Sequence, residues 1–98
     1  MEVNAKMDKI YIVVDGSNVA FHKRTSKKKA KFSNLEIIKK YLERLSDEFP
    51  VVWEIIVDAT LQYRIDSKES LEESFRKGLI SQCPDNIEAD KFILAFYN

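Results

Sequence analysis

The feature that most constrains the fold is an apolar run that ends on an acidic residue. Residues 10–14 read Ile-Tyr-Ile-Val-Val, and Asp15 follows them directly. A succession of β-branched and aromatic residues is typical of a strand buried on both faces, as in the centre of a parallel sheet. Residues 16–18, Gly-Ser-Asn, favour a turn after that strand. Because ligands of open α/β proteins bind at the carboxyl ends of strands, Asp15 is expected at a functional position.

The next element is predicted to be an amphipathic helix. Ser33 and Glu36 have the spacing of a capping box, so the helix is expected to begin at Ser33. Pro50 ends it, because proline has no backbone N–H and its ring clashes with the preceding turn. The apolar positions recur at helical spacing and predict one face that packs on the sheet. These positions are Leu35, Ile38, Tyr41, Leu42, Leu45 and Phe49.

The rest of the chain continues the alternation of strands and helices. Residues 51–57 predict a second strand that closes on Asp58, and residues 79–83 predict a short third strand. Helices are expected to begin at Asp66 and near Ile87. The order β-α-β-α-β-α places the chain in the α/β class. It predicts a three-layer sandwich, in which helices cover a parallel sheet through right-handed crossovers.

Composition limits the class of protein. The 98 residues allow one domain, and no apolar run is long enough to cross a membrane. The first residues lack the apolar region of a signal peptide. Cys83, the one cysteine, cannot form an internal disulfide and is expected to be a small buried residue. We therefore expect a cytoplasmic protein that has no membrane partner.

The net charge of zero hides an asymmetry. The first 31 residues hold eight of the sixteen basic residues but only three of the sixteen acidic ones. The basic residues gather in a loop after the first strand, where lysines would contact phosphates and Phe21 or Tyr63 would stack on bases. A solvated loop without a ligand is the alternative. The candidate substrate-binding residues in this loop are Lys23, Arg24, Lys27, Lys28 and Lys29.

Three segments carry a resemblance to a known family. Residues 15–20 read Asp-Gly-Ser-Asn-Val-Ala, residues 57–66 read Val-Asp-Ala-Thr-Leu-Gln-Tyr-Arg-Ile-Asp, and residues 87–94 read Ile-Glu-Ala-Asp-Lys-Phe-Ile-Leu. In this order they resemble the NYN-type ribonucleases of the PIN-like superfamily, in the Regnase-type branch. The likeness covers residues 9–98. It implies a PIN-like, Rossmann-like fold and a metal-dependent endoribonuclease that hydrolyses single-stranded RNA.

The resemblance also assigns the acids of the site. Asp15 matches the family's first acidic position and Asp90 its mid-domain acidic position. Both are therefore expected to hold Mg²⁺ or Mn²⁺ and to act in catalysis with Asn18. Oxygen ligands suit these hard cations. From the residues alone structural roles stay open, because a strand-end aspartate often forms a turn or cap and a first-turn acid is favoured by the helix dipole.

Other polar residues near the strand ends are candidates for substrate contacts. Ser17 can hydrogen-bond a phosphate, and Asp58 can reach the cavity of the two acids. Arg64 follows in the next connection, and its guanidinium matches phosphate geometry. The alternatives are a plain turn at Ser17, a loop acid at Asp58 and a salt bridge from Arg64 to a nearby aspartate. Glu88 is expected to be exposed to solvent.

The resemblance leaves part of the family domain unmatched. In the family the last helix leads to a further strand beside the Asp15 strand, with further acids, so the chain is expected to lack the last strand or strands. A homodimer or a second chain covering the edge of the first strand is the alternative. A non-catalytic module that binds RNA or a partner is the rival function. An aspartyl phosphatase is disfavoured, because Ser17 stands where its second acid belongs.

Overall fold

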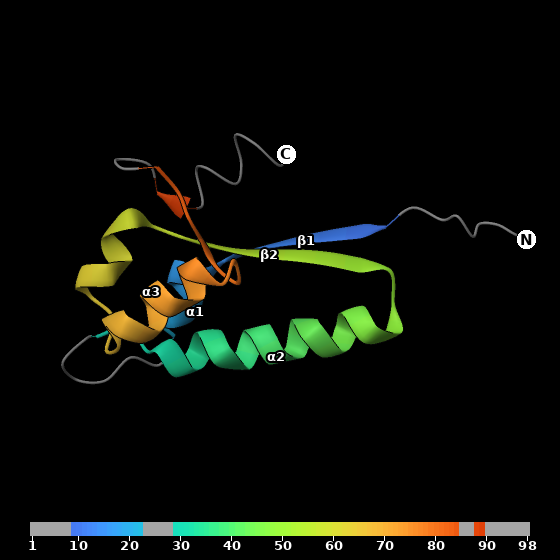
Figure 1. Cartoon of the computed structure of the whole chain (residues 1–98), viewed down its shortest axis with the longest axis horizontal. Helices are drawn as coiled ribbons and strands as arrows, with labels where there is room; N and C mark the ends of the chain where they lie inside the picture. The colour runs from blue at the N-terminus through green and yellow to red at the C-terminus, as the bar shows by residue number, and fades with distance from the viewer. Residues whose placement is uncertain (1–8, 23–28, 85–87, 90–98) are drawn as a thin grey trace, which may run out of the picture.

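The computed structural model describes residues 9–22, 29–84 and 88–89, and these form a sheet with helices packed against it (Figure 1). The strands are β1 (Ile10–Asp15), β2 (Val51–Val57) and β3 (Ser81–Gln82). The helices are α1 (Gly16–Ala20), α2 (Phe32–Glu48), a 3₁₀ helix (Ala59–Tyr63) and α3 (Lys68–Arg76). Both strand pairs are parallel, which confirms the predicted α/β class.

The centre of the sheet is β2, not β1. The strand order is β1-β2-β3, and β1 pairs along its whole length with β2, from Ile10 opposite Val51 to Asp15 opposite Ile56. The prediction of a doubly buried first strand is therefore wrong for the described sheet: Ile10 and Tyr11 are 54% and 72% exposed. The other edge of β1 has no strand beside it among the described residues. Pairing of a second chain with this edge stays a prediction.

The third strand is shorter than predicted. Residues 79–83 were expected to pair, yet only Ser81 and Gln82 do so, opposite Ile56 and Val57 of β2. The cause is a competing set of hydrogen bonds: the N–H groups of Leu79 and Ile80 donate to the Ser74 carbonyl at the end of α3. The segment before β3 is therefore tied to a helix and leaves part of β2 uncovered.

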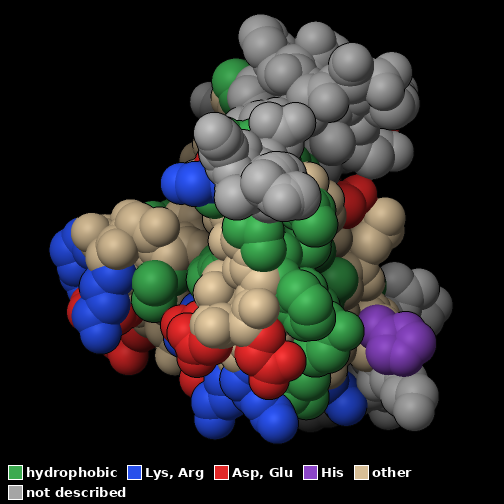
Figure 2. All heavy atoms as spheres, turned by 90° about the vertical axis from the view of Figure 1, so that its right-hand side faces the viewer, with side chains coloured by type: hydrophobic (Ala, Val, Ile, Leu, Met, Phe, Trp, Pro, Cys, Tyr) green, Lys and Arg blue, Asp and Glu red, His purple; other side chains and the backbone are tan. Residues whose placement is uncertain are grey.

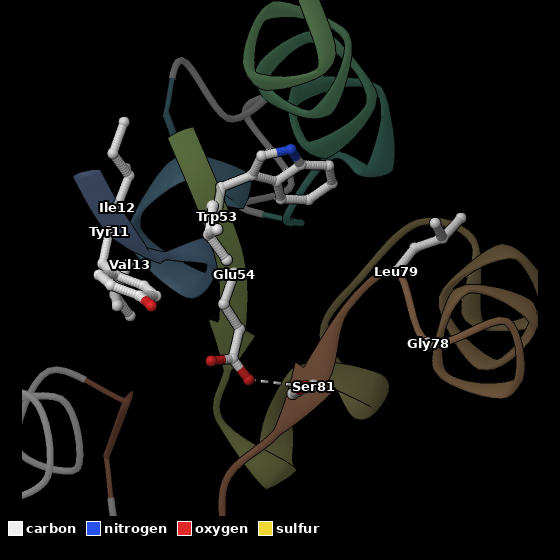
Figure 3. A pocket seen from close by; sticks show the side chains of 9 residues that line it. Tyr11, Ile12, Val13, Trp53, Glu54, Gly78, Leu79 and Ser81 are labelled. Atoms are coloured by element: carbon white, nitrogen blue, oxygen red, sulfur yellow. Dashed lines mark hydrogen bonds between the residues drawn. The ribbon is translucent and has the colours of Figure 1, made fainter. Parts of the chain in front are cut away.

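A pocket of about 550 Å³ lies where β2 is left uncovered (Figure 3). It is lined by residues of β1, β2 and the segment 78–81. Figure 3 shows Trp53 and Glu54 pointing to opposite sides of β2, as successive strand residues must. Ser81 Oγ donates a hydrogen bond to Glu54 Oε2 at 3.2 Å. A polar contact thus joins β2 to β3 beside this pocket.

The three α-helices pack on the same face of the sheet (Figure 1). Ile55 and Val57 of β2 point into this layer, where they meet Leu35, Leu42 and Leu71. The opposite face carries a smaller cluster that joins Ile56, Cys83 and Ala89 to the partly buried Val13. Two layers of the predicted sandwich are therefore present. The helix predicted from near Ile87, which would form the third layer, lies almost wholly outside the described residues.

The apolar face of α2 is narrower than predicted. Leu35 and Leu42 are buried against the sheet, whereas Tyr41 and Phe49 are exposed and so is the neighbouring Ile37. The exposed side chains lie on the part of α2 that turns away from the described sheet. Hydrophobic side chains consequently reach the surface of the molecule, and the end-on view shows such side chains exposed on this face (Figure 2).

The start of α2 is fixed by a distant residue. The helix begins at Phe32 rather than Ser33, and Lys31 at its N-cap makes no side-chain hydrogen bond, so the predicted capping box is wrong. Instead, the Phe32 N–H donates to Asp66 Oδ1 at 2.9 Å. Asp66 was expected to cap α3, but Ser67 does so. Asp66, 34 positions away in the sequence, therefore supplies the hydrogen-bond acceptor that Ser33 was expected to supply.

Replacing Asp66 by alanine is expected to lower the free energy of unfolding by about 1 kcal/mol, the usual cost of a lost helix cap. Ser33→Ala is the matched control, since Ser33 is exposed inside the helix and caps nothing. Urea unfolding followed by circular dichroism measures both. Equal destabilisation by the two variants would contradict the assignment of the cap to Asp66.

Candidate active site

Five polar or charged residues line one pocket at the carboxyl ends of β1 and β2. The pocket has a volume of about 200 Å³ and is lined by Asp15, Ser17, Asn18, Asp58 and Glu88. Its three carboxylates come from three separate segments of the chain. The parallel pairing of β1 and β2 brings the first two together, because the two strands end at the same edge of the sheet.

Asp15 both caps α1 and lines the pocket. Its Oδ1 accepts a hydrogen bond from the Asn18 N–H at 3.3 Å, and its Oδ2 accepts one from Asn18 Nδ2 at 3.0 Å. The two bonds hold the carboxylate and the Asn18 amide side by side. Each carboxylate oxygen has two lone pairs, so capping leaves acceptor capacity for a ligand. The capping and functional interpretations of Asp15 are therefore compatible.

Gly16 allows α1 to pack directly on β2. A Cβ at this position would lie 2.7 Å from side-chain carbons of both Ile55 and Val57, and 3.2 Å from the Ile56 carbonyl oxygen. Real Cβ atoms essentially never approach other atoms so closely, and Ile55 and Val57 are fully buried. The glycine after Asp15 is thus required by close packing, and that packing sets the position of the acid.

Ser17 and Asp58 connect the ends of the two strands. Ser17 is buried, and its Oγ accepts a hydrogen bond from the Asp58 N–H at 2.8 Å. The Asp58 Oδ1 in turn accepts a hydrogen bond from the Ala89 N–H. Asp58 is therefore not a plain loop acid, since it anchors the segment that carries Glu88. A contact between Ser17 and substrate stays a prediction.

Glu88 is the site residue that sequence reasoning missed. It was expected to be solvent-exposed, and it is, yet it also lines the pocket with Asp15 and Asp58. A usable signal was present in the sequence, because the segment that carries Glu88 follows the third strand of a parallel sheet. All three strands end at one edge of such a sheet. Applying the strand-end rule a third time would have added this acid.

Arg64 lies outside the pocket. Its guanidinium carbon is 4.5 Å from the centre of the Phe21 ring, a cation–π contact. It makes no ion pair with Asp58 or Asp66, so the salt bridge that was the alternative to a phosphate contact is not found between these described residues. The Arg64 carbonyl accepts a hydrogen bond from the Ala30 N–H at 2.9 Å. Arg64 therefore stands at the base of the predicted basic loop.

The remaining predicted site residues are mostly beyond the described part of the chain. Lys29 is described and exposed to solvent. Those that lie outside the described residues are Lys23, Arg24, Lys27, Lys28 and Asp90.

Comparison with known proteins decides the family. A family model described as the Zc3h12a-like ribonuclease NYN domain matches residues 8–97. The chain belongs to this family. The NYN domain resemblance is thereby confirmed, and the PIN-like fold with it; membership implies nuclease activity on RNA. No curated protein and no solved structure matches the chain. None of the helices in the described part of the NYN domain is long and apolar enough to cross a membrane.

The donors in the pocket suit the divalent cations that PIN-like nucleases use. All of them are oxygens, and carboxylate oxygen is the preferred ligand of Mg²⁺ and Mn²⁺. Within residues 9–22, 29–84 and 88–89, no three acidic, histidine or cysteine side chains are close enough to hold a metal ion together. The oxygen donors of the NYN domain pocket are therefore of the type that binds such a cation, and the role of Asp90 as a metal ligand stays a prediction because this residue lies outside the described residues.

The acidic pocket lies close enough to Cys83 to affect the pKa of its thiol. Burial raises the pKa of this thiol above its ordinary value of 9.0, and the negative charges of Asp58 and Asp15 raise it further. The thiol is 2% exposed, as expected for a small buried residue. Cys83 is therefore held in its protonated form next to an acidic site.

This raised pKa predicts how stability depends on pH. The folded domain keeps the Cys83 proton at a pH where the unfolded chain has lost it. The contribution is therefore complete below pH 9.0 and is lost as the pH rises through the pKa of the folded state. The free energy of unfolding should fall by at most about 1.4 kcal/mol per pH unit from this group. The free energy of unfolding, measured in urea at several pH values above 9, should fall less steeply with pH for Cys83→Ala than for wild type. The same pH dependence in both proteins would contradict the assignment.

Proposed function

We propose that this NYN domain is a metal-dependent endoribonuclease that hydrolyses phosphodiester bonds of single-stranded RNA. The observation that carries the proposal is the convergence of Asp15, Asp58 and Glu88 on one pocket, in a chain that belongs to a ribonuclease family. Metal-dependent hydrolysis of a phosphodiester needs several carboxylates around one small cavity. The pocket is formed at the strand ends, where α/β proteins bind their ligands.

The residues have separate roles in this proposal. Asp15 and Asp90 hold Mg²⁺ or Mn²⁺, which when bound activates water and stabilises negative charge on the phosphate. The Asn18 amide, held beside Asp15, donates a hydrogen bond to the substrate phosphate or to the attacking water. Asp58 fixes the backbone at Ala89, next to Asp90, through its bond to the Ala89 N–H. A break in that bond would shift one metal ligand relative to the other.

The basic residues supply the affinity for RNA. Lys29 and Arg64 are exposed, and the Ala30–Arg64 hydrogen bond brings the chain segments that carry them together. Lysine and arginine contacts to phosphate release counterions, so binding should weaken steeply as salt is raised. Lys23, Arg24, Lys27 and Lys28 extend this positive segment in the sequence.

The function is tested with a circular single-stranded RNA, which has no ends and is cut only by an endonuclease. Incubation with Mn²⁺ or Mg²⁺ should linearise it, and excess EDTA should prevent the cut. The same sequence annealed to its complement should be resistant. Linearisation in EDTA would contradict the metal requirement, and equal cutting of the duplex would contradict the preference for single strands.

A further inference from the structure

A second pocket lies along α2 beside the acidic one. It has a volume of about 530 Å³, and Asn18, His22, Ile37 and Tyr41 contribute to its walls. Ile37 and Tyr41 are 67% and 60% exposed, so a helix face that would normally be buried is open to solvent. In the end-on view, hydrophobic side chains reach the surface close to the one histidine of the chain (Figure 2). We refer to this pocket as the α2 groove.

The α2 groove adjoins the acidic pocket. Asn18 lines both, and its amide is held by the Asp15 carboxylate. Hydrogen bonds also join α1 to α2 beside the groove. Asn34 Nδ2 donates to the carbonyl oxygens of Val19 at 3.1 Å and His22 at 2.8 Å. A ligand that spans Asn18 would therefore meet two preformed surfaces, one acidic and one apolar.

Positive charge flanks the α2 groove on its solvent side. Lys40 and Arg44 stand three residues after Ile37 and Tyr41, which on a helix places them beside these side chains. Both are exposed, and neither forms an ion pair with another described residue. An apolar and aromatic wall edged by cations matches the chemistry of a nucleotide, with a base to bury and a phosphate to neutralise.

We propose that the α2 groove binds a nucleobase of single-stranded RNA, adjacent to the phosphate that enters the acidic pocket. Tyr41 supplies the stacking surface, and Lys40 and Arg44 contact the RNA backbone beside it. The volume falls in the range of about 300–1,000 Å³ that is usual for small-molecule sites. The inference rests on the proposed function for the nature of the ligand, and it assigns the neighbouring nucleotide a place on the protein.

RNA binding in the presence of EDTA tests the proposal without interference from cleavage. Fluorescence anisotropy with a labelled single-stranded RNA should show that Tyr41→Ala raises the Kd about 5- to 150-fold, the effect of losing one stacked base. Tyr41→Phe keeps the ring and should retain wild-type affinity. Tyr11→Ala removes another exposed tyrosine, near the start of β1, and should have no effect. Circular dichroism confirms that each variant is folded.

The outcomes separate this proposal from the proposed function. If wild type cleaves RNA but Tyr41→Ala binds it as tightly as wild type, the α2 groove is not a base site and the nuclease stands. If Tyr41→Ala weakens binding although wild type cleaves nothing, the base site stands and the nuclease fails. If Tyr41→Ala leaves RNA affinity unchanged but converts a dimer to a monomer, the occupant is a second copy of the chain and the proposal is overturned.

Discussion

Replacement of Asp15 by asparagine is expected to lower the rate of RNA cleavage by at least about 100-fold, the scale of losing one group that stabilises developing charge at an active site. The fold should survive. Asparagine is as good a helix N-cap as aspartate, and its side-chain oxygen can still accept the bond from the Asn18 N–H. What disappears is the negative charge at the end of β1, which the proposed metal requires.

Asp47→Asn is the matched control for this variant. It makes the same chemical change near the end of α2, at the opposite end of the sheet from the pocket. Initial cleavage rates with saturating Mn²⁺ and thermal unfolding midpoints should be measured for both variants. Asp47→Asn should match wild type in both. An Asp15→Asn protein that is folded and cuts at the wild-type rate would remove Asp15 from the chemistry.

Replacement of Gly16 by alanine is expected to give a large structural effect for a single added methyl group. The added carbon would lie 2.7 Å from side-chain carbons of Ile55 and Val57, which are both fully buried, so something in the core must shift. Overpacking of this kind typically costs about 1–3 kcal/mol. To relieve the clash, α1 must shift away from β2, and Asp15 and Asn18 should move with it. The cleavage rate per folded molecule should therefore fall, in addition to the loss of folded protein.

Gly78→Ala separates this packing effect from backbone strain. Gly78 has a φ of +73°, and a Cβ there would meet nothing within 4 Å, so the cost is confined to the left-handed conformation, about 1 kcal/mol. Urea unfolding and cleavage rates per folded molecule should be compared for the two variants. Gly78→Ala should retain wild-type activity. Equal activity of folded Gly16→Ala and Gly78→Ala would show that close packing of α1 does not position the site.

Local sequence was enough where neighbouring residues decide the structure. The second strand has the predicted bounds, Val51–Val57, and Gly78 follows α3 in the left-handed conformation that favours glycine. Local sequence failed where distant residues decide. The start of α2 depends on Asp66, and the length of β3 depends on bonds to the Ser74 carbonyl. The exposure of β1 depends on which strands lie beside it, and the strand's own residues do not encode that.

The same division holds for the site. The strand-end rule brought Asp15 and Asp58 to one edge of a parallel sheet, and the structure puts them in one pocket. The bond from the Asp58 N–H to Ser17 spans 41 positions and has no local signature. Glu88 was missed for a different reason, because the strand-end rule also applies to the segment after the third strand and places this acid at the same edge of the sheet. The hydrogen bond from the Ala89 N–H to Asp58 Oδ1 then holds that segment in place.

The most direct test of the proposed site is a titration of the ¹⁵N-labelled domain with Mn²⁺, whose unpaired electrons broaden the signals of nearby amides. We expect that amides of residues 16–18, 58–59 and 88–89 lose intensity first, and that Asp15→Asn abolishes this selective loss. Broadening that begins elsewhere, or uniform broadening at a Mn²⁺ concentration that supports maximal cleavage, would contradict a metal site at the carboxyl ends of β1 and β2.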